Sequence, residues 1–341
     1  MNAVLTLENA LAAIMMVALN AYVLLGGADF GGGVWDLLAG GPRKRGQRAL
    51  IADAIAPIWE ANHVWLILVV VLLFSCFPPA FARLGTALHV PLALLLIGIV
   101  LRGSAFTFRA YDDRADTAQR RWGATFAVAS LVTPVLLGVC IGAVAAGRVS
   151  AAPAGGFVAG WVRPWLTPFG FGVGALALAL FSFLAAVYLT LEARTDELRE
   201  DFRRRALGAA VAVFATAALV LALADEAAPR VRAGLTSAPW AIPLHVATGA
   251  AAVTAIAALW TRRFRLARLA AGAQVSLILW GWALAQFPYL LPPDLTIAAA
   301  AAPRATLRLV LGALALGALV LIPSLAYLLR VFKSHPRAEA R

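Results

Sequence analysis

Residues 55–66, IAPIWEANHVWL, decide how this chain is interpreted, because they place Glu60, Asn62 and His63 between two tryptophans inside an apolar stretch. The surrounding segment, residues 51–75, is long and hydrophobic enough to cross the hydrocarbon layer of a bilayer. An ionisable group at that depth is costly, and it is usually turned toward other protein groups or internal water. Glu60 is therefore a candidate functional residue.

The rest of the chain is equally apolar. Of its 341 residues, 62% are hydrophobic and only 13% are charged, which is typical of integral membrane proteins. The pattern predicts an all-α integral membrane protein with nine transmembrane helices in a single membrane domain, residues 1–341. The predicted spans are 7–39, 51–75, 82–108, 122–146, 165–191, 206–225, 239–260, 269–288 and 307–332.

The basic residues predict the orientation of these spans. Of the 29 Lys and Arg residues, 21 lie in odd-numbered connections, seven lie in even-numbered ones, and Arg102 lies within a span. The positive-inside rule then places the odd connections and the C-terminus in the cytoplasm, and the N-terminus in the periplasm. The net charge of +12 is therefore attributed to topology-determining loops and not to a nucleic-acid-binding surface.

Three consecutive spans each carry one charged residue. At about 1.5 Å per helical residue, Asp29 lies about 15 Å, Glu60 about 14 Å and Arg102 about 9 Å from the cytoplasmic face. We expect the three residues to cluster between the midplane and that face. Two carboxylates and one guanidinium can hold a proton at intermediate pH, as a proton path requires. The alternative is a buried ion pair that only fixes helix packing.

Several neighbours of Glu60 are candidate contacts for a cofactor or a partner, namely Trp59, Asn62, His63 and Trp65. For the aromatic residues and His63, packing within the core is the simpler interpretation. The sequence contains no metal-binding motif, and we expect no metal site and no heme in this chain. Cys76 and Cys140 both fall toward the predicted outer face, where a disulfide is chemically allowed. Spacing alone does not pair them, and free apolar thiols in the core are the favoured interpretation.

Several motifs resemble subunit II of cytochrome bd-type quinol oxidases, including the cyanide-insensitive branch. They are GGADFGGGVWDLL, IAPIWEANHVWLI, LRGSAFTFR, TPFGFGVGALAL, YLTLEA and FPYLLPPDLT, and together they run along essentially the whole chain in order. The first two motifs in combination are specific, whereas a glycine cluster alone is not.

The resemblance implies a non-heme subunit of a bacterial inner-membrane complex that oxidises quinol and reduces oxygen to water. Hemes b and heme d are implied in the partner, subunit I, and a structural quinone and small single-helix subunits are further implied partners. The implied fold has two four-helix bundles, at about 1–146 and 165–288, and a peripheral ninth helix at about 307–332. Asp29, Glu60 and Arg102 match family positions proposed for proton delivery.

The chain departs from the family pattern at three positions. Glu60 stands where an aspartate is common, which keeps the charge and lengthens the side chain. Thr107 and Gly26 stand where some members carry acids, so a proton path in this chain rests on fewer groups. A different class, an ion-coupled secondary transporter, is disfavoured because spans five to eight contain no counterpart of the polar residues in spans one to three.

Overall fold

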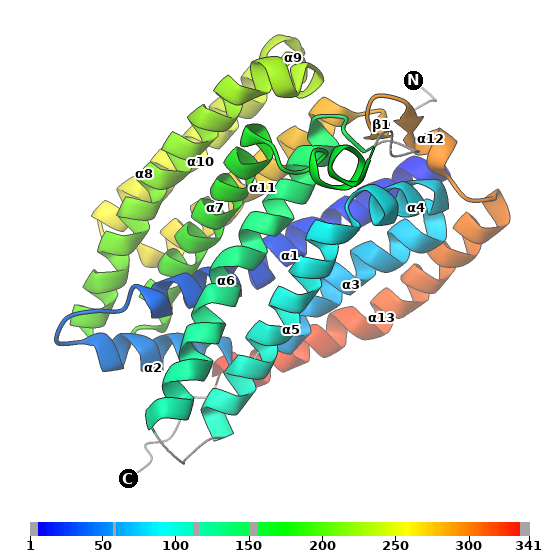
Figure 1. The fold of residues 1–341 in the computed structure, drawn as a ribbon. Helices are drawn as coiled ribbons and strands as arrows, with labels where there is room; N and C mark the ends of the chain where they lie inside the picture. Colours follow the sequence, from blue (N-terminus) through cyan, green and yellow to red (C-terminus); the bar gives the residue numbers. More distant parts are fainter. Residues whose placement is uncertain (1–5, 57–58, 112–115, 150–155, 335–341) are drawn as a thin grey trace.

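The computed structural model describes residues 6–56, 59–111, 116–149 and 156–334, which are mainly helical (Figure 1). Two short strands, β1 (Tyr289–Leu291) and β2 (Leu295–Thr296), form an antiparallel hairpin. The helices are α1 (Leu7–Leu37), α2 (Lys44–Ile55), α3 (Trp59–Cys76), α4 (Pro78–Ala87), α5 (His89–Tyr111), α6 (Asp116–Ala145), the π-helix η1 (Val158–Val162), α7 (Pro168–Glu192), α8 (Asp196–Ala227), α9 (Pro229–Ser237), α10 (Ala241–Trp260), α11 (Phe264–Gln286), α12 (Ile297–Ala300) and α13 (Arg304–Ser334).

Within the described ranges, nine helices are long and apolar enough to cross a membrane, as the sequence predicts. They are α1, α3, α5, α6, α7, α8, α10, α11 and α13. Helix α1 lies in the interior, where it packs against α3, α6, α7 and α11, whereas α13 packs mainly against α1 and α3 among the described helices (Figure 1). The interior position of α1 brings the residues around Asp29 into the protein core.

Glycines make the close approach of α1 to its neighbours possible. A Cβ atom at Gly31 would lie 2.0 Å from the carbonyl oxygen of Phe181 in α7, and one at Gly33 would lie 2.1 Å from Oγ of Ser130 in α6. Neither space admits a side chain. Small residues at such positions let helix backbones touch, which is how helices associate in an apolar solvent.

The second span begins later than the sequence predicts. Residues 51–55 belong to α2, which ends at Ile55, and the membrane-spanning helix is α3, which begins at Trp59. Figure 1 shows α2 running across one end of the longer helices. Its apolar residues Leu50, Ile51 and Ile55 are buried, and Ile55 lies against Gly32 of α1. Judged by hydropathy alone, the apolar residues at the end of α2 and those of α3 form one continuous span.

The third span is also shorter than predicted, because residues 82–87 belong to α4 and the spanning part of α5 is His89–Phe108. The helix α4 ends at Ala87, and Leu88 has a non-helical φ of −112°. The apolar sequence continues through Leu88, so hydropathy does not show this break. Cys76 and Cys140 are both buried free thiols, as the sequence favours. They lie in one apolar cluster with residues such as Leu72 and Val139.

Candidate functional site

Asp29 is a buried carboxylate in the interior of the helix array. Its side chain, on α1, is 3% exposed. The Asn62 amide on α3 donates a hydrogen bond of 2.7 Å from Nδ2 to Oδ2 of Asp29. This contact joins the two sequence motifs that contain the residues. A buried carboxylate with one amide partner retains acceptor sites for further donors, including water.

Arg102 is a buried guanidinium on α5, with a residue exposure of 2%. Its Cζ atom lies over two aromatic faces, 4.6 Å from the ring centroid of Phe30 and 5.4 Å from that of Phe126. Its Nε and Nη2 atoms have no hydrogen-bond partner among the described residues. Arg102 and Asp29 attract each other electrostatically, although Asn62 is the direct partner of the carboxylate. The cation–π contacts offset part of the cost of burying the guanidinium.

Glu60 does not join this interior pair. Its side chain is exposed in the isolated chain, whereas Asn62 is buried. Two residues advance an α-helix by about 200°, so positions 60 and 62 face nearly opposite directions. Glu60 instead continues an exposed apolar row on α3 that is made of Val64, Ile67, Val71 and Phe74. Of the three residues predicted to cluster, Asp29 and Arg102 lie in the interior, and Glu60 does not.

The aromatic candidates beside Glu60 pack within this chain. The His63 ring lies 6.1 Å from Tyr22, 6.3 Å from Phe30 and 6.2 Å from Trp59, measured between ring centroids. The Trp59 ring also lies 6.1 Å from Phe106. Trp65 packs against the largest apolar core. Each of the three residues therefore has packing neighbours within this chain.

Two buried hydroxyl groups lie on the face of α6 that meets α1 and α5. Oγ of Ser130 and Oγ1 of Thr133 have no hydrogen-bond partner among the described residues. Ser130 faces Gly33 of α1, and Thr133 faces Gly98 of α5, one helical turn before Arg102. Buried polar groups of this kind are suited to hold ordered water. The sequence gives no signal for Ser130 and Thr133, because one serine or threonine in an apolar helix is common.

The site is therefore an arrangement of polar groups enclosed in apolar helices. Asp29 can accept or donate a proton, Arg102 supplies a fixed positive charge, and Asn62 orients the carboxylate. Within the described residues, no group of three or more His, Cys, Asp or Glu side chains is placed to hold a metal ion. Thr107 donates a hydrogen bond of 3.0 Å to the carbonyl of Gly103 within α5. This bond explains how its hydroxyl is accommodated.

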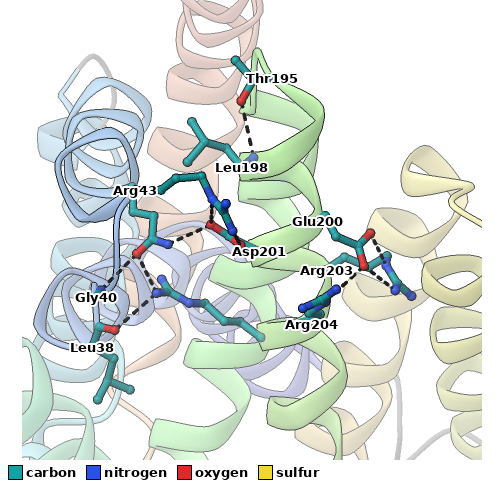
Figure 2. A network of polar contacts seen from close by, with 11 residues as sticks. Leu38, Gly40, Arg43, Thr195, Leu198, Glu200, Asp201, Arg203 and Arg204 are labelled. Carbon is teal, nitrogen blue, oxygen red and sulfur yellow. Dashed lines mark hydrogen bonds and ion pairs between the residues drawn. The ribbon is translucent and has the colours of Figure 1, made fainter.

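A second polar network lies where the connection from α1 to α2 meets α8 (Figure 2). The Asp201 carboxylate accepts hydrogen bonds of 2.8 Å from Nε of Arg43 and 2.8 Å from Nε2 of Gln47. Nη2 of Arg205 donates to Oε1 of Gln47 at 2.8 Å and to the carbonyl of Leu38 at 3.2 Å. The hydrogen bonds that Arg43 donates to the Asp201 carboxylate raise the pKa of Arg43. The network ties the end of α1 and the start of α2 to α8.

The comparisons with known proteins agree with this architecture. The family model described as cytochrome bd terminal oxidase subunit II matches residues 7–332. The putative cytochrome bd menaquinol oxidase subunit II of Bacillus subtilis is 21% identical over 93% of this chain and 92% of its own length. The structure of bd oxidase from Geobacillus thermodenitrificans contains a chain with a TM-score of 0.77 and 24% identity, covering 96% of this chain and 99% of that one.

A further relative is similar over a shorter region. The cytochrome bd-I ubiquinol oxidase subunit 2 of Escherichia coli K12 is 29% identical over 127 residues, which are 37% of this chain and 32% of that protein. The alignment therefore spans about a third of that relative, whereas the family model spans nearly the whole of this chain. Together with the nine apolar helices, the extent of the family match decides the assignment: the chain belongs to the cytochrome bd terminal oxidase subunit II family.

Proposed function

We propose that this chain is the non-heme subunit of a terminal oxidase that oxidises quinol and reduces oxygen to water in the respiratory chain. The observation that carries the proposal is the family match over residues 7–332 of a protein with nine apolar helices. The same two findings make the chain a multi-pass protein of the bacterial inner membrane. Hemes b and heme d, held by subunit I, would supply the redox chemistry of the complex.

The exposed face of α3 supports a role in holding a partner. The exposed row on α3 begins with Glu60 and continues through Val64 and Ile67. An ionised carboxylate on such a row is unfavourable against lipid and is better accommodated by a protein partner or water. We infer that subunit I covers this row and that the present chain stabilises it.

We further infer that Asp29 and Arg102 lie on a proton path from the cytoplasm and that Glu60 extends it toward subunit I. Water held by Arg102, Ser130 and Thr133 would connect the interior groups. Along α1, Asp29 lies about 12 Å from the end of the helix at Leu37. The part of the proposed path between Asp29 and this end of α1 is therefore short. In this chain, Asp29 holds the proton, Asn62 orients its carboxylate, and Arg102 stabilises the ionised form.

The proposed topology follows the distribution of basic residues, with the N-terminus in the periplasm and the C-terminus in the cytoplasm. We also propose two four-helix bundles, at about 1–146 and 165–288, with 307–332 as a peripheral helix. The pairs α1–α3 and α5–α6 pack in the first group, and α7–α8 and α10–α11 pack in the second. A structural quinone and small single-helix subunits stay predictions.

Purification in mild detergent through a tag on this chain tests the proposal. A reduced-minus-oxidised spectrum and mass analysis of the product should show heme b and heme d bands together with a larger subunit. A colourless single chain that keeps its fold would contradict the proposal. The alternative role, a purely structural subunit, keeps the hemes and the partner and differs only in the effect of substitutions at Asp29 and Glu60.

A further inference from the structure

We propose that a pocket lined by arginines at one end of α10 and α11 binds the phosphate-bearing headgroup of an anionic phospholipid. The pocket has a volume of about 470 Å³ and lies between the end of α7 and the turn that joins α10 to α11. Four of its lining residues are arginines, at positions 199, 262, 263 and 265. The proposal does not depend on the oxidase activity.

Two of the four arginines already have carboxylate neighbours. Nη1 of Arg199 contacts Oδ1 of Asp196 at 2.5 Å, and Arg199 also donates to the carbonyls of Thr190 and Ala193. Nη2 of Arg262 lies 3.7 Å from Oε2 of Glu200, and Oε1 of the same carboxylate pairs with Arg203 and Arg204. These contacts hold the two side chains in place around the pocket.

Arg263 and Arg265 provide the uncompensated charge. Both side chains are exposed, and neither has an ion-pair partner among the residues that the structure describes. Guanidinium groups match phosphate oxygens in a bidentate geometry. Arg263 also precedes the first turn of α11, where no side chain caps the backbone N–H groups. Those N–H groups add to the positive potential that the two arginines create.

The surroundings favour a lipid over a soluble anion. Three large apolar side chains on the same helix pair are highly exposed, namely Val253 (67%), Trp260 (72%) and Leu269 (72%). An exposed tryptophan at a helix end is typical of the membrane interface. Figure 1 shows α10 and α11 on the side of the molecule away from α13. A headgroup in the pocket would therefore place its acyl chains along an apolar surface.

Tryptophan quenching by brominated lipids tests the proposal. The full-length chain, with the subunits that co-purify, is reconstituted in vesicles containing brominated phosphatidylglycerol or brominated phosphatidylcholine. Comparison with Trp260→Phe isolates the signal of Trp260. We expect the Trp260 signal to be quenched more strongly by brominated phosphatidylglycerol than by brominated phosphatidylcholine. In Arg263→Gln/Arg265→Gln this preference should fall roughly fivefold per arginine removed, since each basic residue contributes about 1 kcal/mol near an anionic surface.

The matched control is Arg304→Gln/Arg308→Gln, which removes two exposed arginines from the first turns of α13. This control should leave the preference at Trp260 unchanged. An equal preference in the parent protein and in Arg263→Gln/Arg265→Gln would overturn the proposal, as would an equal loss in the control. Inorganic phosphate at constant ionic strength should compete weakly. Full loss of the preference with phosphate would reassign the pocket to a soluble anion and overturn the lipid assignment.

Discussion

The contact between α1 and α7 makes a quantitative prediction for Gly31→Ala. The new Cβ atom would lie 2.0 Å from the carbonyl oxygen and 2.5 Å from the carbonyl carbon of Phe181, and 2.8 Å from Cβ of Ala185. Carbon atoms normally approach to about 3.5–4.0 Å, so the two helices must separate by roughly 1 Å. Because the obstacle is backbone, no side-chain rotation relieves it.

Overpacking of this kind costs about 1–3 kcal/mol, and we expect the upper part of that range. The higher helix propensity of alanine returns about 1 kcal/mol at most. At about 2.1 cal/mol/K per residue, unfolding a chain of 341 residues has an entropy of about 0.7 kcal/mol/K, so a net loss of about 2 kcal/mol lowers the melting temperature by about 3 °C. Thermal unfolding of the purified protein, followed by circular dichroism at fixed detergent concentration, measures this change.

Gly208→Ala is the matched control, because nothing lies within 4 Å of a Cβ atom built at Gly208. Gly208 is on α8, and its substitution should leave the melting temperature unchanged or slightly higher. If Gly31→Ala melted at the same temperature as both Gly208→Ala and the parent protein, the close approach of α1 to α7 would be wrong.

Three further predictions concern other parts of the fold. Asp201→Asn should lower the melting temperature at low salt, with a smaller difference at 1 M salt, because Arg43 and its partner carboxylate are near solvent; an equal difference at both salt concentrations would contradict this reasoning. Cys76 and Cys140 should resist a maleimide in the folded protein and react after denaturation in dodecyl sulfate, and rapid labelling of the folded protein would show that they are not buried. Asn62→Leu removes the hydrogen-bond partner of a buried carboxylate and should cost about 1–3 kcal/mol, which thermal unfolding would detect; a melting temperature equal to that of the parent would argue against this contact.

Much of the architecture is predictable because hydropathy reports directly on membrane crossing. All nine spans are present among the described residues, and the first and seventh begin and end within two residues of the predicted bounds, whereas α8 begins ten residues before the predicted sixth span. Spans two and three are wrong at their first residues, for a common reason. Helices α2 and α4 each place apolar residues directly before a span, and a hydropathy window does not distinguish a separate short helix from the start of the next one.

The candidate site is predictable only in part. Asp29 and Arg102 are identified by their charge in apolar spans, and both are buried. Glu60 is identified by the same criterion but points elsewhere, because the depth of a residue says nothing about its direction around the helix. Its predicted depth of about 14 Å is also wrong, because that value counts residues 51–58 as part of the span, whereas α3 begins at Trp59 and Glu60 lies in its first turn. Phe30 and Phe126, which face the guanidinium, carry no chemical signal in the sequence. Their role depends on how α1, α5 and α6 pack, which single-sequence periodicity does not specify.

Asp29→Asn tests the proposed proton path most directly. Asparagine keeps the size of the side chain at Asp29 and removes its ability to carry a proton. Oxygen consumption should be measured per heme in the complex purified through this chain. Asp36→Asn is the control, since Asp36 is another buried aspartate of α1, near Arg48 at 3.8 Å.

If a proton path runs through Asp29, the complex that carries Asp29→Asn should assemble with its hemes. It should consume oxygen at least about tenfold more slowly than the parent complex, since positioned proton-transfer groups accelerate reactions by about 10²–10⁴-fold. Asp36→Asn should keep the parent rate per heme. Parent-like turnover per heme in Asp29→Asn, with a lower yield of complex, would contradict the path and would show that Asp29 serves helix packing alone.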